Sequence, residues 1–380
     1  MAKLGEICAF QSGGTPSKNK PEYFGGEIPW ISTTALNGGK INEADAVAWI
    51  TPKAIRESAA KIVPANSIMV GTRVGIGKVA INTVEMSTSQ DVISLIGIDK
   101  DKWYKPYLCK LLLSKKDYFN SQARGATIKG IKIDVVANID VPEIDYATQR
   151  KVAATLNKID TLIVLRKQQL EKLDELIKAR FVEMFGDPVK NTMDWEIKPL
   201  SELGELNRGV SKARPRNSPE LLGGPYPLIQ TGEVANAKTY ITSFNSTYSE
   251  KGLAQSKMWP KGTLCITIAA NIAQTSILTF DACFPDSVVG FISRNMTNEL
   301  FIHYWFSFFQ KILDEQAPQV AQKNINLKIL SELNVIVPPL SLQNRFAAFV
   351  ERVDQQKQTV QQSLEKLELM KKALMQEYFG

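Results

Sequence analysis

Cationic side chains are interleaved with hydroxyl and amide groups in several polar segments of this sequence. The densest segment is RGVSKARPRNSP (208–219), which carries four cations between Arg208 and Arg216. Arginine and lysine neutralise phosphates or pair with guanine edges, while asparagine and glutamine can pair bidentately with adenine. These residue types predict a nucleic-acid-binding surface. For any single lysine or arginine, a solvated surface charge is the simpler interpretation.

The candidate contact residues fall into two sets, one in each half of the chain. The first set is Ser17, Lys18, Lys20, Thr33, Thr34, Arg73, Lys78, Arg124 and Lys129, with Thr127 between the last two. The second set is Arg208, Lys212, Arg214, Arg216, Gln230, Thr231, Asn271, Gln274, Gln322 and Lys323, with Asn324 beside the last.

A glycine-rich segment, GTRVGIGKVAI (71–81), resembles a phosphate-binding loop only in outline. Thr72 stands where such a loop needs its first glycine, and Val79 stands where it needs serine or threonine. Ala80 likewise replaces the last glycine of a dinucleotide-binding motif. The segment therefore predicts no nucleotide site.

Patterns for catalysis and for metal binding are also missing. The single histidine, His303, lies in the aromatic run FIHYWFSFF, which predicts a packed core or boundary residue. One imidazole offers no pair for a zinc site, and a Ser-His-Asp arrangement would depend on it alone. The Asn/Asp-Pro-Pro-aromatic tetrapeptide of an amino-methyltransferase does not occur, since Pro338-Pro339 lies between Val337 and Leu340. We therefore predict a binding protein with no catalytic residue and no metal site of its own.

Length and charge narrow the class of protein. The chain has 380 residues, which suggests two or three domains, and its net charge of +7 permits an acidic partner without requiring one. No apolar run approaches the roughly 20 residues that cross a bilayer, and we see no signal peptide. The four cysteines show no CxxC spacing, so we expect reduced thiols and a cytoplasmic location.

The chain contains an internal repeat, the feature to seek before any other. Glu171-Lys172-Leu173 recurs as Glu365-Lys366-Leu367, at an offset of 194 residues. IPWIST (28–33) recurs as YPLIQT (226–231), at an offset of 198. Insertions in surface loops would produce this small drift. The sequence therefore predicts a globular unit and a helix, followed by a second copy of both.

Each copy ends in a long helical segment with a heptad pattern. Apolar residues alternate at spacings of four and three, broken by Arg166 in the first copy and by Lys357 and Lys371 in the second. We expect an antiparallel coiled coil, because a globular unit precedes each helix, and we expect the three cations to extend to water. A helix buried in a core is the alternative. The predicted seam residues are Leu156, Ile159, Ile163, Leu170, Leu173, Val350, Val353, Val360, Leu364 and Leu367.

The globular units are predicted to mix α and β structure. In the first unit, apolar runs favour strands at 28–31, 67–71, 78–84, 92–98 and 138–141, with a helix at 102–117. The second unit repeats the order, with strands at 226–230, 263–268, 275–280 and 288–293 and a helix near 298–312. The predicted fold class is α/β (α+β) with an internal pseudo-two-fold repeat.

These features together resemble the specificity (S) subunit of type I restriction-modification systems. SGGTPS (12–17) and IPWIS (28–32) carry the resemblance near the start. NIDVP (138–142) with ATQRKVAATLNKID (147–160) closes the first unit, and VPPLSLQNRFAAFVERVD (337–354) closes the second. Each helix then ends in Phe-Gly. The resemblance covers essentially the whole chain.

The resemblance implies two target recognition domains, at 1–147 and 187–339, that each read one part of a bipartite, asymmetric site in double-stranded DNA. It also implies helical spacers at 148–186 and 340–380, which form the antiparallel coiled coil and dock two methyltransferase (M) subunits. S-adenosylmethionine, ATP and Mg would belong to the M and restriction (R) subunits, with no cofactor in this chain and no membrane partner. The different seam cations of the two spacers put symmetric docking in doubt.

Two other functions stay open on the sequence. A coiled-coil scaffold could present two protein-binding domains. Salt separates this alternative from a DNA reader, whose duplex affinity falls steeply as the salt concentration rises. An enzyme in its own right would transfer methyl groups or cleave DNA as the purified chain alone.

Overall fold

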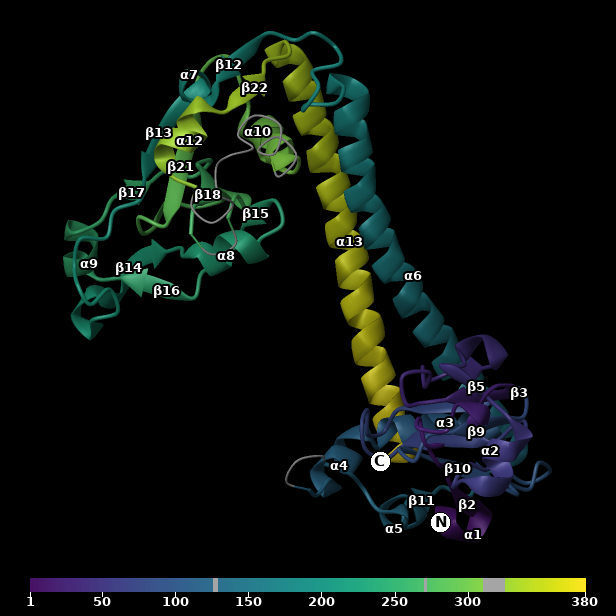
Figure 1. Ribbon diagram of the computed structural model, residues 1–380. Coiled ribbons are helices and arrows are strands. Elements are labelled where there is room, and N and C mark those ends of the chain that lie inside the picture. Colours follow the sequence, from purple (N-terminus) through teal and green to yellow (C-terminus); the bar gives the residue numbers. More distant parts are fainter. Residues whose placement is uncertain (126–128, 270–271, 310–324) are drawn as a thin grey trace. The chain divides into compact units, whose positions relative to one another are not determined.

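The computed structural model describes residues 1–125, 129–269, 272–309 and 325–380 (Figure 1). The chain divides into two compact units. The first unit comprises Met1–Lys167 and Gln362–Gly380, and the second comprises Gln168–Gln361. Each unit joins a globular body to segments of both long helices. The two domains and two helical spacers predicted from the sequence therefore follow one another along the chain, but each compact unit combines one body with parts of both helices.

Among the described residues, three sheets build the body of the first unit. The largest has the order β2–β10–β7–β8–β4, with β2 (Ala9–Ser12), β4 (Lys40–Ile41), β7 (Ile68–Gly71), β8 (Val79–Asn82) and β10 (Val92–Ile96). The next has the order β5–β3–β9–β6, with β3 (Phe24–Ile31), β5 (Ala48–Ile50), β6 (Ile62–Val63) and β9 (Met86–Thr88). The last pairs β1 (Ala2–Lys3) with β11 (Asp140–Val141). The helices are α1 (Leu4–Ile7), α2 (Pro52–Glu57), α3 (Lys105–Ser114), α4 (Lys116–Gln122) and α5 (Ile133–Ala137).

The body of the second unit has the same three sheets in its described residues. The largest has the order β13–β21–β18–β19–β15, with β13 (Gly204–Arg208), β15 (Tyr240–Ile241), β18 (Leu264–Thr267), β19 (Thr275–Leu278) and β21 (Val288–Ser293). The next has the order β16–β14–β20–β17, with β14 (Leu222–Leu228), β16 (Ser246–Tyr248), β17 (Met258–Trp259) and β20 (Ala282–Cys283). The last pairs β12 (Ile197–Pro199) with β22 (Asn334–Ile336). The helices are α7 (Leu200–Leu203), α8 (Thr231–Asn236), α9 (Glu250–Ala254), α10 (Glu299–Phe306) and α12 (Leu327–Glu332).

The two bodies share one topology, strand for strand. β10 and β21 each pair antiparallel with two neighbours in the five-stranded sheet. The register of β3 shifts between Phe24 and Ile28, and that of β14 shifts at the equivalent place, between Leu222 and Tyr226. The predicted pseudo-two-fold repeat and the mixed α and β fold class are confirmed.

Every apolar run predicted as a strand overlaps a strand of the structure. β7, β8 and β18 are buried at every residue, as expected of strands covered on both faces. The helix predicted at 102–117 begins only at Lys105, because Pro106 occupies its first turn, where proline is favoured. The helix near 298–312 ends at Phe306, and residues 310–312 of that prediction lie outside the described residues.

α6 (Tyr146–Phe185) and α13 (Leu340–Phe379) are the two long helices. In the first unit, Asp160 pairs with Lys371 and Lys167 pairs with Glu368, so the two helices run antiparallel. In the second unit, Asp174 pairs with Lys357, and Arg180 lies 5.7 Å from the ring centroid of Phe349, so the direction is again antiparallel. Among the helices that the structure describes, none combines the length and hydrophobicity needed to span a bilayer.

The predicted seam residues differ in burial along the helices. The buried ones are Leu156, Ile159, Val350, Val353, Val360 and Leu364, and the half-buried ones are Ile163, Leu170, Leu173 and Leu367. Leu156 belongs to the core of the first body, while Val350 and Val353 belong to that of the second. The ends of the long helices therefore also serve as core helices.

The repeated Phe-Gly pair anchors a helix end in each body. Phe379 lies 5.3 Å from Tyr107 between ring centroids, and the Lys115 ammonium donates to the carbonyl oxygens of Phe379 and Gly380 at 2.6 and 2.8 Å. Phe185 lies 4.9 Å from Phe301 in the core of the second unit. The same dipeptide therefore ends one helix in each unit.

The expectation that the seam cations extend to water is wrong. Lys357 is buried, and its ammonium lies 2.7 Å from Asp174 and 3.1 Å from Asp354. Burial opposes its charge, but these hydrogen bonds and ion pairs outweigh burial and raise the pKa of Lys357. The Lys371 ammonium lies 2.6 Å from Asp160, and Arg166 donates to the Ser363 hydroxyl at 3.3 Å. The reason is local: each aspartate directly follows a seam residue, which brings its carboxylate within reach of a seam cation.

One buried glutamine fixes each long helix to its body, and the two glutamines make equivalent hydrogen bonds. The Gln149 amide accepts from the Tyr104 N–H at 2.8 Å and donates to the carbonyls of Lys102 and Ile144. The Gln343 amide accepts from the Asn298 N–H at 3.1 Å. It donates to the carbonyls at 296 and 338, the repeat equivalents of 102 and 144. This explains why the junction sequence places a glutamine at the start of each helix.

Candidate nucleic-acid interface

Two predicted arginines of the first unit meet at one cavity. Arg73 and Arg124 line a cavity of about 630 Å³ together with Gln122 and Lys132. Arg73 lies on the turn between β7 and β8, and the Ile131 N–H donates to the Thr72 carbonyl at 2.8 Å, which ties the segment after Arg124 to this turn. Sequence reasoning brought out Arg73 and Arg124 but missed Gln122 and Lys132, which lack a dense local run of cations.

The glycine-rich segment 71–81 is a β-hairpin and not a phosphate-binding loop. β7 ends at Gly71 and β8 begins at Val79, so no helix follows the glycines. Gly75 and Gly77 have φ values of +73° and +74°, which a residue with a Cβ rarely adopts. The glycines therefore serve the tight turn that carries Arg73.

A carboxylate of the next turn faces Arg73. Asp91 lies between β9 and β10, and its carboxylate is 3.7 Å from the Arg73 guanidinium. The carbonyl of Asp91 also accepts hydrogen bonds from the N–H and the hydroxyl of Thr72, at 2.8 and 3.1 Å. One aspartate therefore holds the base of the Arg73 turn and pairs with its cation.

The other candidates of the first unit divide by burial. Thr33 is 4% exposed and lies against Gly71, so its prediction as a DNA contact is wrong: the turn after β3 directs it into the body. Thr34 is exposed, with its hydroxyl 2.8 Å from that of Ser32. The Lys20 ammonium donates to the Tyr23 hydroxyl at 2.9 Å, which raises the pKa of Lys20. The remaining exposed candidates are Ser17, Lys18, Lys78 and Lys129.

Three arginines of the second unit converge on one aspartate. The Arg216 guanidinium lies 2.6 Å from the carboxylate of Asp286, and the Arg214 guanidinium lies 3.9 Å from it. Arg208 donates to the backbone carbonyl of Asp286 at 2.9 Å. The structure thus brings together three of the four cations of the 208–219 segment, while Lys212 is exposed without joining this cluster.

A small cavity beside this cluster collects polar groups. It has a volume of about 160 Å³, and the predicted residues Arg216, Gln230 and Thr231 line it with Asn217 and Ser287. Gln230 and Thr231 are placed by α8, whose first turn they form: Gln230 caps the helix and Thr231 is its first residue. The arrangement offers guanidinium, amide and hydroxyl donors on one surface, which is the set that reads base edges and phosphates.

The remaining candidates of the second unit do not join this cluster. Gln274 is exposed and lines a different cavity, of about 520 Å³. Asn271, Gln322 and Lys323, with Thr127 and Asn324, lie outside the described residues.

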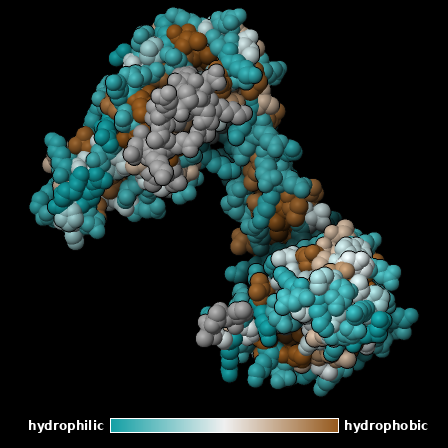
Figure 2. Space-filling view, viewed as in Figure 1, coloured by the Kyte–Doolittle hydropathy of each residue, from teal (hydrophilic) through white to brown (hydrophobic). Residues whose placement is uncertain are grey.

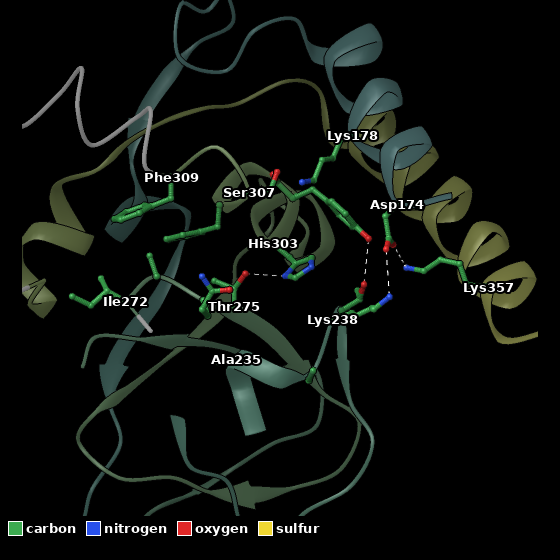
Figure 3. Close-up of a pocket in the computed structure, with 16 residues that line it drawn as sticks. Asp174, Lys178, Ala235, Lys238, Ile272, Thr275, His303, Ser307, Phe309 and Lys357 are labelled. Atoms are coloured by element: carbon green, nitrogen blue, oxygen red, sulfur yellow. Dashed lines mark hydrogen bonds and ion pairs between the residues drawn. The ribbon is translucent and has the colours of Figure 1, made fainter. Parts of the chain in front are cut away.

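The larger cavity lies beside the long helices of the second unit (Figure 3). Asp174 accepts from Lys357 at 2.7 Å and from Lys238 at 3.4 Å. Burial opposes the charge of Asp174, but the two lysines outweigh burial and lower its pKa. His303 is packed here, with Nδ1 2.9 Å from the Thr275 hydroxyl, and burial lowers its pKa to about 4. The prediction of a packed core or boundary histidine is confirmed.

Metal chemistry gains no support from the geometry. Within the described residues, no group of three or more His, Cys, Asp or Glu side chains could hold a metal ion. The four cysteines are unpaired, and three of them are buried.

The chain thus combines two bodies of one topology, a cluster of arginines in each body, and an antiparallel pair of long helices. The family model of the type I restriction modification DNA specificity domain matches residues 1–175 and 192–369. The chain belongs to this family.

Two curated relatives and two solved structures are similar to this chain. The specificity subunit of the type I restriction enzyme MjaIX from Methanocaldococcus jannaschii is 30% identical over 227 residues, which cover 55% of this chain and 52% of that protein. The EcoR124I/EcoR124II specificity subunit from Escherichia coli is 29% identical over 192 residues, or 46% of each chain. The chain spans about half the length of the curated relatives it matches.

The structural matches extend over the whole chain. An S subunit from M. genitalium matches with a TM-score of 0.60 and 16% identity, covering 100% of this chain and 95% of that one. A chain from a structure on complex assembly and conformational transition of the type I R-M system matches with a TM-score of 0.64 and 18% identity, covering 100% and 96%. These likenesses show a shared fold.

Proposed function

We propose that this chain is the DNA-reading subunit of a type I restriction-modification complex. Each body reads one part of a bipartite site in double-stranded DNA. The observation that carries the proposal is the pair of cation clusters, Arg73 with Arg124 in one body and Arg208 with Arg214 and Arg216 in the other. Both clusters involve the turn that precedes the equivalent strands β10 and β21.

The helical pair serves as the docking surface for methyltransferase subunits in this proposal. Exposed apolar side chains gather on the helices, as Figure 2 shows. Surface patches of this kind are typical of interaction sites. In the first unit they include Val164, Leu165, Leu369 and Met370, which are 53%, 51%, 67% and 52% exposed. In the second unit they include Leu176 and Val182.

In this proposal, the partner subunits carry out DNA methylation and cleavage. The methyltransferase subunits would supply S-adenosylmethionine and adenine methylation, and restriction subunits would supply ATP- and Mg-dependent cleavage. This chain would contribute recognition and assembly without catalysis, in the cytoplasm. The support is the family membership and the specificity-subunit identity of its relatives.

Mapping N6-methyladenine in cellular DNA with and without this gene tests the proposal. The expected result is one methylated motif with two parts and a gap, present only with the gene. No gene-dependent motif would contradict it.

A binding assay then separates the DNA reader from the protein scaffold. The reconstituted complex with its methyltransferase subunits is titrated with duplex at 50 to 200 mM salt. We expect the logarithm of the binding constant to fall linearly with the logarithm of the salt concentration. Changing Arg73 to Ala should weaken binding through the first part of the motif. A complex with no duplex affinity at any salt concentration would favour the scaffold.

A further inference from the structure

Asp286 stands on a rigid turn, while its arginine partners stand on a long loop. The turn at 284–287 is held by hydrogen bonds from the Val210 N–H to the Phe284 carbonyl at 3.1 Å and from the Val288 N–H to the Pro285 carbonyl at 3.0 Å. Phe284 is fully buried and stacks on Trp259 at 4.8 Å between ring centroids. The carboxylate therefore has a fixed position relative to the core.

The arginine loop is less well anchored. Gly209 and Val210 are hydrogen-bonded to Val288 and Phe284, but after Val210 the backbone is tied to the body through Gln255, which accepts from the N–H groups of Lys212 and Ala213. Arg214 and Arg216 are 57% and 43% exposed and carry long side chains, and Arg214 donates to the carbonyls of Ser211 and Ala213 on its own loop. Ordering such side chains at the moment of binding costs conformational free energy.

We propose that Asp286 is a positioning residue for DNA recognition by the second body. Its carboxylate lies 2.6 Å from Arg216 and holds that guanidinium in the orientation in which it meets DNA. Arg214 lies farther away, at 3.9 Å, and also donates to the carbonyls of Ser211 and Ala213, so Asp286 only adds to its positioning. The ordering cost is thereby met before binding. Asp91 has the same role for Arg73 in the first body, where the carboxylate is 3.7 Å from the guanidinium. This inference rests on the proposed function, because it assumes that these arginines contact DNA.

The proposal is tested by whether one substitution, Asp286→Asn, raises or lowers the affinity for duplex DNA. A carboxylate near DNA repels phosphates, so electrostatics alone predicts that Asp286→Asn strengthens duplex binding. Positioning predicts the opposite for the target: Asp286→Asn should weaken specific binding about tenfold, while affinity for unrelated duplex stays equal or rises. Glu202→Gln, at an exposed carboxylate on α7, removes the same charge and should leave specific binding within about twofold.

The measurement uses the reconstituted complex and three duplexes: the mapped motif, the motif with its second part scrambled, and unrelated DNA. The loss caused by Asp286→Asn should vanish on the duplex with the scrambled second part. Asp91→Asn should show the mirror result, with a loss that depends on the first part alone. Equal or tighter binding of Asp286→Asn to the full motif would overturn the proposal.

A double-substitution cycle distinguishes positioning from a general effect on the fold. Asp286→Asn should add nothing in a background of Arg214→Ala with Arg216→Ala, because its partners are gone. It should add fully to Arg208→Ala, since Arg208 contacts the backbone carbonyl, which the substitution leaves in place. Full additivity with the double arginine variant would also overturn the proposal. Asp286→Glu should recover part of the affinity, and an unchanged unfolding midpoint excludes loss of the body.

Failure of this inference is distinct from failure of the proposed function. If the double arginine variant loses affinity through the second part but Asp286→Asn does not, only the positioning role is wrong. If the intact complex binds the motif no better than unrelated DNA, the proposed function and the positioning role fall together.

Discussion

The two units place opposite charge arrangements where their bodies meet the long helices. In the first unit, one carboxylate, Asp160, lies between Lys110 and Lys371, at 2.7 and 2.6 Å. In the second unit, one ammonium, Lys357, lies between Asp174 and Asp354. Asp160 and Asp354 are equivalent in the repeat. Asp160 pairs with two lysines, whereas Asp354 pairs with one lysine that also pairs with Asp174.

The comparison teaches which part of a duplicated fold is free to change. Gln149 and Gln343 bond to backbone groups, and the same backbone groups recur in both units. The ion clusters join side chain to side chain, so any arrangement that pairs each buried charge will serve. The arginines around Asp91 and Asp286 show the same freedom, with one arginine facing Asp91 and three arginines around Asp286.

Removing one lysine from each ion cluster should give the largest contrast. Lys357→Met leaves the partly buried Asp354 without a cation and Asp174 with only Lys238, and should cost about 3 kcal/mol of unfolding free energy. Lys371→Met leaves Asp160 paired with Lys110 and should cost about 1 kcal/mol or less. Urea titration of the full chain measures both. Equal losses would show that the clusters are energetically alike.

The glutamine junctions should give the next effect, equal in the two units. Gln149→Ala and Gln343→Ala each remove the glutamine partner of three backbone groups that are buried or partly buried, at about 1 kcal/mol for each group. We expect a loss of about 3 kcal/mol in each variant. Hydrogen exchange should place the loss in the body that carries the substitution. Gln376→Ala, at an exposed position on α13, serves as the control.

Low pH should destabilise the second unit more than the first, because only the second unit contains a histidine, His303. Burial lowers its pKa to about 4 in the folded chain, below the ordinary value of about 6.5. The folded chain favours the neutral imidazole of His303. The stability that this preference contributes is therefore complete above pH 6.5 and declines as pH falls towards 4. The loss should reach about 2 kcal/mol at pH 5. His303→Gln should remove this pH dependence from the unfolding free energy, and an unchanged slope would contradict the assignment.

The smallest effect should come from Glu368, the repeat equivalent of Asp174. Its pair with Lys167 has both side chains about half exposed, whereas Asp174 pairs with a buried lysine. Glu368→Gln should cost less than about 0.5 kcal/mol, because exposed pairs are screened by water and salt. Asp174→Asn, measured alongside by the same urea titration, should cost several times more. A loss of similar size in both would break the contrast.

Prediction from sequence succeeded where periodicity or repetition carried the signal. The heptad pattern predicted both long helices, and the apolar runs predicted the central strands β7, β8, β18 and β21. Two-residue strands such as β4 and β15 are too short to carry a period, so only their hydrogen-bond partners reveal them. Thr33 and Thr34 are adjacent and chemically identical, and only the turn after β3 decided which of them is exposed.

The amino-acid sequence by itself determined the duplicated architecture, the pairing of the long helices and the residue types available to meet DNA. Each of these follows from local periodicity or from comparing the chain with itself. The tertiary structure alone decided that Asp286 gathers three arginines, that Asp91 faces Arg73, and that the seam lysines are paired rather than solvated. The physical reason is separation along the chain: Arg216 and Asp286 are 70 residues apart, and Lys357 and Asp174 lie on different helices. No local pattern records which distant charge completes a pair, because only folding brings the two together.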